Sequence, residues 1–89
     1  MKAILTVIGQ DKVGIIAGVS SELQKNNINI LDVNQTIMQG YFTMIMMLDM
    51  NEMSTSFDVA KANLLAKGEE LGVDVKIQRE ELFNSMHTL

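Results

Sequence analysis

Residues 6–19 read TVIGQDKVGIIAGV, and this stretch decides the fold because it joins a strand to a helix through a short loop. Upstream of the loop, residues 2–8 are mostly apolar at odd and even positions alike, which predicts a strand buried on both faces. Downstream, apolar residues recur at helical spacing from Ile15 to Leu23, which predicts a helix with one buried stripe that ends near Asn26.

Three more strands and a second helix are predicted after this unit. Residues 28–38 alternate between apolar and polar, while residues 41–50 carry one unbroken apolar face, and Gln39-Gly40 between them suits a tight hairpin turn. The second helix follows the N-cap hydroxyls of residues 54–56 and ends at Gly72, and the last strand spans residues 73–79. The resulting element order is βαββαβ.

This order predicts an α+β fold, the ferredoxin-like sandwich, with both helices on one face of an antiparallel sheet. Strands one and three are apolar on both faces and belong in the middle, so the expected strand order is 4-1-3-2. We expect one domain over residues 1–79. A tail over residues 80–89 follows, and its apolar residues predict a short C-terminal amphipathic helix: Leu82, Phe83, Met86 and Leu89.

The face of the sheet without helices keeps apolar surface in this arrangement. Strand one contributes part of it, and strand three adds Tyr41, Ile45 and Met47. Because contiguous apolar patches on small domains usually mark interfaces, the pattern predicts a homodimer or a higher homo-oligomer.

Composition narrows the choice of partners. The 89 residues carry a net charge of −4 and no cysteine, and the seven basic residues are spread along the sequence. Phosphate backbones and anionic membranes are bound by clustered positive charge, so we expect no direct nucleic-acid contact and no membrane contact. A cytoplasmic location is expected, since no apolar run is long enough to span a membrane.

The sequence offers no catalytic set. His87 is the only histidine and lies near the C-terminus, with only Glu80 and Glu81 close to it in sequence. Neither a Ser-His-Asp arrangement nor a metal site is indicated by these residues. We therefore expect a protein that is not an enzyme, with no cofactor and no metal.

The loop after the first strand is the best candidate binding site. A helix that opens near Gly14 presents unpaired N–H groups, which suit a carboxylate, and glycine lets a ligand approach the backbone. Asp11 beside it suits an ammonium group, and we expect Asn29, which begins the next strand, to lie at the same end as the loop. The alternative is purely structural, with Asp11 capping the helix and Gly14 allowing tight packing.

The same stretch, residues 6–19, together with residues 27–32 (NINILD after Asn26), resembles the ACT-domain signature. That signature is a strand, a loop with Asp or Asn, two further residues, a glycine, and an apolar helix. The resemblance covers residues 2 to about 79 and implies a ligand-binding regulatory domain whose site lies at a dimer interface. The residues that it implies as ligand-binding are Gln10, Asp11, Val13, Gly14, Ile15, Asn29 and Ile30, with Ile15 and Ile30 contributing backbone groups.

Two functions follow as hypotheses. In the first, the protein is a dimeric regulatory module that binds a small molecule, most simply an amino acid, and controls amino-acid metabolism through a partner protein. In the second, the fold is a dimerising structural or interaction adaptor without a ligand. Six of the eight methionines lie between Met38 and Met53, and methionine-rich surfaces adapt to partners, although core filling explains the same cluster.

Overall fold

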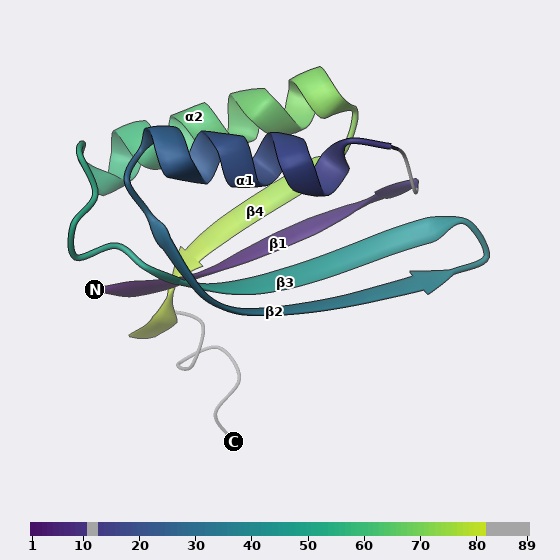
Figure 1. Cartoon of the computed structure of the whole chain (residues 1–89), viewed down its shortest axis with the longest axis horizontal. Helices are drawn as coiled ribbons and strands as arrows, with labels where there is room; N and C mark the ends of the chain where they lie inside the picture. The colour runs from purple at the N-terminus through teal and green to yellow at the C-terminus, as the bar shows by residue number, and fades with distance from the viewer. Residues whose placement is uncertain (11–12, 82–89) are drawn as a thin grey trace.

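The computed structural model describes residues 1–10 and 13–81, which form one sheet and a layer of helices above it (Figure 1). The predicted C-terminal helix falls largely on residues 82–89, outside the described residues. The elements, in chain order, are β1 (Lys2–Gln10), α1 (Ile15–Lys25), β2 (Asn29–Met38), β3 (Tyr41–Asp49), α2 (Phe57–Leu71) and β4 (Asp74–Arg79).

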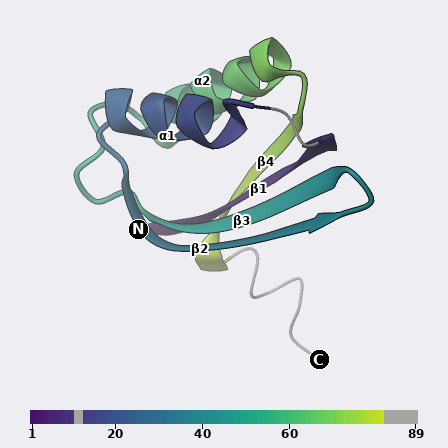
Figure 2. The same cartoon turned by 45° about the vertical axis from the view of Figure 1, so that its right-hand side comes forward.

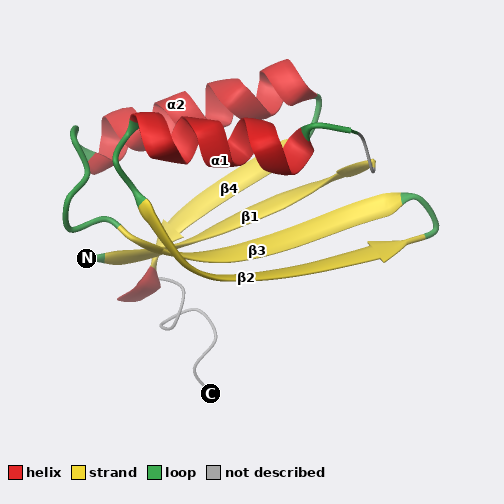
Figure 3. Cartoon of the chain, viewed as in Figure 1, coloured by secondary structure: helices red, strands yellow, loops and turns green. Residues whose placement is uncertain are grey.

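The sheet has the strand order β2-β3-β1-β4, and every neighbouring pair is antiparallel. This confirms the predicted ferredoxin-like topology and the placement of β1 and β3 in the middle. Helices α1 and α2 cover the same face, and on the opposite side the described residues contribute only the short helical start at residues 80–81, after the end of β4 (Figures 2 and 3). We call this opposite side the open face; at its centre lie residues 4, 6 and 8 of β1 and residues 43, 45 and 47 of β3.

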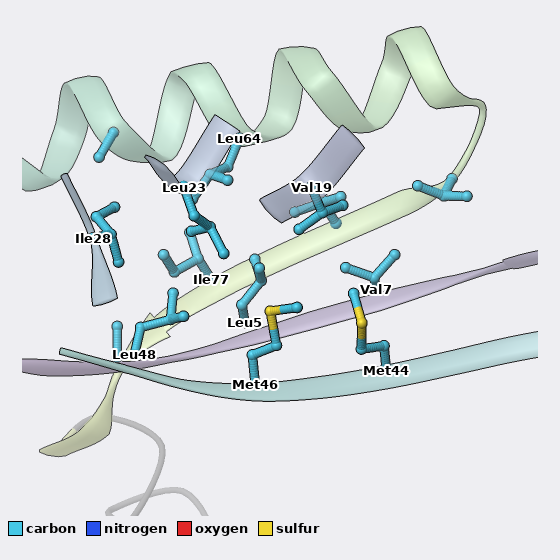
Figure 4. Close-up of a cluster of buried hydrophobic side chains, with 14 of the residues drawn as sticks. Leu5, Val7, Val19, Leu23, Ile28, Met44, Met46, Leu48, Leu64 and Ile77 are labelled. Atoms are coloured by element: carbon cyan, nitrogen blue, oxygen red, sulfur yellow. The ribbon is translucent and has the colours of Figure 1, made fainter. Parts of the chain in front are cut away.

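The hydrophobic core lies between the sheet and the helices (Figure 4). The side chains of Leu5 and Val7 on β1 point toward the helices, and those of Val19 and Leu23 on α1 point toward the sheet. Strand β3 supplies Met44 and Met46 to the same layer, and both are fully buried. Most of the clustered methionines therefore fill space inside the domain, which is the structural explanation of the methionine cluster.

Helix α2 packs closely on β4 because Gly68 has no side chain. A Cβ at that position would lie 2.5 Å from Val75 Cγ2 and 3.1 Å from the carbonyl oxygen of Val73. The helix begins at a hydroxyl N-cap, where Ser56 Oγ accepts a hydrogen bond from the Val59 N–H at 3.2 Å, and it ends at Gly72 with φ of 75°. The predicted start and end of the second helix are both confirmed.

One buried polar residue ties the two helices together. The Asn26 amide donates to the carbonyl oxygen of Glu22 at 2.7 Å, and its oxygen accepts a hydrogen bond from the amide of Asn63 on α2 at 2.9 Å. Because both ends of this amide are satisfied, its burial at the end of α1 fixes how α1 lies against α2.

Strand β2 extends beyond the cover of the helices. Val33 pairs with buried Met46 and Ile37 pairs with buried Phe42, so both point toward the helix side. They nevertheless remain 45% and 57% exposed. A register shift at Leu31 also moves Asn29 off the face that simple alternation assigns to it. The edge of the sheet at β2 is therefore long and apolar on its helix side.

Candidate functional site

The loop half of the predicted site lies where β1 ends and α1 begins. Gln10, Val13, Gly14 and Ile15 surround this turn, whereas Asp11 lies outside the described residues. Ile15 is buried in the core, and Val13 is fully exposed. These residues therefore come together at one end of the sheet, as the sequence predicts.

Gly14 is the N-cap of α1 and is required by its backbone conformation. Its φ is 93°, in the left-handed region, and a Cβ placed there would meet nothing within 4 Å. The structural alternative in which Gly14 permits tight packing is therefore wrong. No side chain among the described residues caps α1, and its first turn carries no acidic residue. The positive end of the helix dipole is thus available to an anionic group.

The strand half of the site lies at the other end of the sheet. Asn29 pairs with Asp49, which in turn pairs with Lys2 at the beginning of β1, whereas Gln10 pairs with Tyr41 at its end. The expectation that Asn29 lies at the same end as the loop is therefore wrong. The physical reason is that β1 and β2 run parallel with a helix between them, so their N-terminal ends share one side of the sheet.

Asn29 and Ile30 instead line a hollow of about 600 Å³ between the C-terminal half of α1 and the beginning of β2. Its walls include Ser20 and Gln24 of α1 and Asp49 at the end of β3. The remaining lining residues are Leu23, Asn27, Ile28, Asn51 and Glu52. The hollow lies beside the uncovered edge of β2, because α1 and β2 supply two of its walls.

The chemistry of this hollow is polar and acidic. Asp49 and Glu52 bring carboxylates, and no lining residue is basic. Part of the rim is held by hydrogen bonds, since the Asn27 amide donates to the carbonyl oxygen of Glu52 at 2.6 Å and Asp49 Oδ1 accepts from the Asn51 N–H at 2.9 Å. A hollow of this composition suits a hydrogen-bonding group or a cation rather than an anion.

Sequence reasoning missed most of these lining residues. Ser20 and Gln24 look like ordinary exposed positions of an amphipathic helix, and Asp49 and Glu52 look like the polar end of a hairpin strand. Counting the hairpin outward from Gln39-Gly40 places Met50 opposite Asn29, and only the register shift at Leu31 brings Asp49 there instead, so the sequence carried no simple signal for this neighbour.

The fold also gathers basic residues that are far apart in the sequence. Lys61 of α2 and Lys76 and Arg79 of β4 line a hollow of about 470 Å³, whose walls also include Asp58 and the apolar Phe57. The Arg79 guanidinium lies 4.8 Å from the centre of the Phe57 ring, a cation–π contact. Three of the basic residues that are spread along the sequence thus line one hollow in the fold. Three cations beside a carboxylate still fall short of the extended basic surface of nucleic-acid-binding proteins.

Two further features of residues 1–10 and 13–81 concern metal binding and membrane insertion. No group of three or more His, Cys, Asp or Glu side chains in this part of the chain is placed to hold a metal ion. None of its helices combines the length and the apolar character needed to cross a lipid bilayer.

Comparison with known proteins identifies the family. Residues 2–78 match the ACT domain model. A UPF0237 protein from Listeria monocytogenes is 61% identical over 89 residues, which is the full length of both chains. An ACT domain protein from Streptococcus pneumoniae has a solved structure with a TM-score of 0.81 and 38% identity, covering 93% of each chain.

A more distant solved structure, a putative glycine cleavage system transcriptional repressor, shares the fold at a TM-score of 0.73 and 19% identity. The match covers 88% of this chain and 44% of that protein. The fold, the family model and the full-length relatives agree, and this chain therefore belongs to the ACT domain family of ligand-binding regulatory modules.

Proposed function

We propose that this protein is a regulatory module that binds an amino acid between two copies of the chain and passes the signal to a partner protein. The observation that carries this proposal is the separation of the two halves of the candidate site. Gly14 and its neighbours lie at one end of the sheet, and Asn29 with its hollow lies at the other. A site that needs both halves is incomplete within one chain.

The separation is too large for one small ligand to bridge. Eight residue steps along a strand span roughly 26 Å, and Asn29 and Gln10 are two strand spacings apart, which gives about 28 Å in total. An amino acid has backbone carboxylate and ammonium groups only a few ångströms apart. One molecule therefore touches both halves only if they come from different copies.

The uncovered edge of β2 supports a contact that brings them together. β2 is an edge strand of ten residues, NILDVNQTIM, with no lysine, arginine or proline, and the one register shift lies near its beginning. Natural edge strands are usually protected from pairing by such residues. Val33 and Ile37 add exposed apolar surface on the helix side, and Ile16 of α1 is exposed as well.

Antiparallel pairing of β2 with β2 of a second copy improves the geometry of the site. When the pairing is centred on the strand, Asn29 lies opposite the partner's Met38, whose row leads through Tyr41 to Gln10. Three strand spacings then separate Asn29 from the partner's loop, or about 14 Å between backbones. Side chains and a ligand fill a gap of this size, and the hollow beside Asn29 is closed by the partner.

The two halves differ in charge in the way that an amino acid requires. The N-terminus of α1 at Gly14 suits a carboxylate, because its N–H groups carry partial positive charge. The carboxylates of Asp49 and Glu52 beside Asn29 suit an ammonium group. Asp11, as the resemblance implies, offers a second acceptor in the loop.

The proposal is tested by thermal unfolding in the presence of single amino acids and related small acids. A ligand at about 100 times its Kd stabilises the folded state by ~2.7 kcal/mol, which for a domain of this size raises Tm by roughly 10 °C or more. We expect one chemical class of amino acid to give this shift and Asn29→Ala to abolish it. Asn34→Ala, on the same strand but outside the hollow beside Asn29, is the matched control.

Mixing two inactive variants tests whether the site spans two copies. Asp11→Ala and Asn29→Ala each remove one half, so neither variant binds alone. After exchange of subunits, a mixed pair contains one intact loop opposite one intact Asn29, and part of the binding returns. Absence of any recovery in mixtures that do exchange subunits contradicts a shared site.

A flat response to the whole panel, with the fold intact, contradicts the ligand-binding proposal and leaves the adaptor hypothesis. The buried methionines do not favour that hypothesis, because Met44, Met46 and Met50 lie in the core. Pull-downs with and without the effective amino acid then test regulation, since a partner of a true sensor binds differently in the two states.

A further inference from the structure

The open face of the sheet is a second apolar surface, separate from the edge of β2. Ile8 and Ile45 at its centre are 43% and 46% exposed, and Tyr41 near one end is 60% exposed. Polar residues flank this centre on both outer strands, Asn34 on β2 and Lys76 on β4. An apolar centre with a polar rim is the usual composition of a protein–protein interface.

The residues on this face are arranged so that the face is complementary to itself. One row across the sheet reads Lys76, Thr6, Ile45 and Asn34, from β4 to β2. A two-fold axis parallel to the strands, between two stacked sheets, reverses this order in the second copy. Lys76 then lies over the partner's Asn34, and Ile45 lies over the partner's Thr6.

The neighbouring rows remain compatible under the same rotation. Ile4 of β1, which is only 7% exposed within one chain, lies over the partner's Met47, because these two residues pair across β1 and β3 within each chain. At the end of the sheet Lys2 and Asp49 pair in the same way, so Lys2 meets the partner's Asp49 with opposite charge. Toward the hairpin end of the sheet, Asp74 of β4 lies over the partner's Thr36 rather than over another acidic residue.

From this pattern we infer that the open face is covered by the open face of a second copy, with the helices of both copies on the outside. The contact goes beyond the proposed ligand site and does not depend on it. Together with pairing along β2, it joins copies into an open row, because the partner's β2 lies over β4 of the first copy and its free edge faces the other way. An isologous interface requires each contact to occur twice with its roles exchanged, and the rows described above satisfy that requirement.

The size of the face sets the expected strength of the contact. Four strands with six paired residues each cover roughly 400 Å² of projected surface per copy. This is about half of the ~800 Å² that each partner buries in a typical stable interface. The association is therefore expected to depend on protein concentration, and the measurements need a series from micromolar to millimolar protein.

Sedimentation velocity of the full chain tests the inference with two single variants and their combination. Ile45→Glu places a charge at the centre of the open face, and Ile37→Lys places one on the edge of β2; both side chains are exposed, so circular dichroism should show an intact fold. We expect species larger than two copies for the original chain at high concentration, two copies for each single variant, and one for the double variant.

The outcomes separate this inference from the proposed function. If Ile45→Glu leaves the mass of the assembly unchanged, the open-face contact between copies is overturned. The same result is expected if another protein or residues 82–89 of the chain cover the face. A mass that falls with Ile45→Glu but not with Ile37→Lys supports the open-face contact and counts against pairing along β2.

Charge reversal tests the orientation of the two copies. Lys2→Glu faces the partner's Asp49 with like charge and is expected to weaken association several-fold. Adding Asp49→Lys restores the attraction and should recover most of that loss. Lys61→Glu on α2, away from the open face, is the matched control. A double variant as weak as the single one excludes the two-fold axis along the strands.

Discussion

The two edge strands of the sheet, β4 and β2, differ in how closely a helix covers them. At β4 the helix α2 packs closely, because Gly68 leaves room for the strand, and Ile77 is only 4% exposed. At β2 no helix closes the edge in the described residues, and Ile37, on the same helix-side face, is 57% exposed. One edge is part of the core of a single chain, whereas the other is a surface suited to association.

The largest expected effect comes from the same substitution at both edges. Ile77→Lys buries an unpaired charge and should cost about 4 kcal/mol or more, which unfolds most of a small domain. Ile37→Lys should leave the fold intact, because its side chain reaches water. Urea unfolding measures both, and Ile37→Lys should also reduce the dependence of the unfolding midpoint on protein concentration. Equal losses in the two variants contradict the difference between the edges.

A smaller effect is expected from filling the space between α2 and β4. Gly68→Leu places side-chain atoms where Val75 and the Val73 carbonyl already lie, and overpacking should destabilise the domain by about 3 kcal/mol. Ala66→Leu on the exposed side of the same helix is the control and should change stability by less than about 0.5 kcal/mol. A stable Gly68→Leu variant means that α2 lies further from the sheet than the structure shows.

The smallest effect is expected at the start of α1, the helix on the β2 side. Gly14→Ala forces a side chain into the left-handed region with nothing to clash against, so the cost should be only about 1 kcal/mol. Gly14→Asn should cost less, since asparagine tolerates this conformation. Chemical unfolding of both variants without ligand measures these costs, and a stabilising Gly14→Ala rules out the positive φ.

The order of the strands was predictable from the sequence because burial on one or both faces leaves a direct pattern in the residues. The loop half of the site was predictable for a related reason, since a glycine before an apolar helix marks a helix start. The position of Asn29 relative to that loop was not read correctly. Asn29 begins β2, whereas the loop follows the end of β1 at Gln10. Because β1 and β2 run parallel, the beginning of one lies far from the end of the other.

The sequence by itself determined the elements, their order and the family, because hydrophobic periodicity, capping residues and the loop motif are local properties of the chain. The predicted order 4-1-3-2 of an antiparallel sheet already makes β1 and β2 parallel, so it implies that the two halves of the candidate site lie at opposite ends of the sheet. Tertiary structure alone decided that Lys61, Lys76 and Arg79 line one hollow and that one edge is closed while the other stays open. These features depend on strand direction and on how far each helix lies from the sheet, which are long-range properties that no short stretch of sequence records.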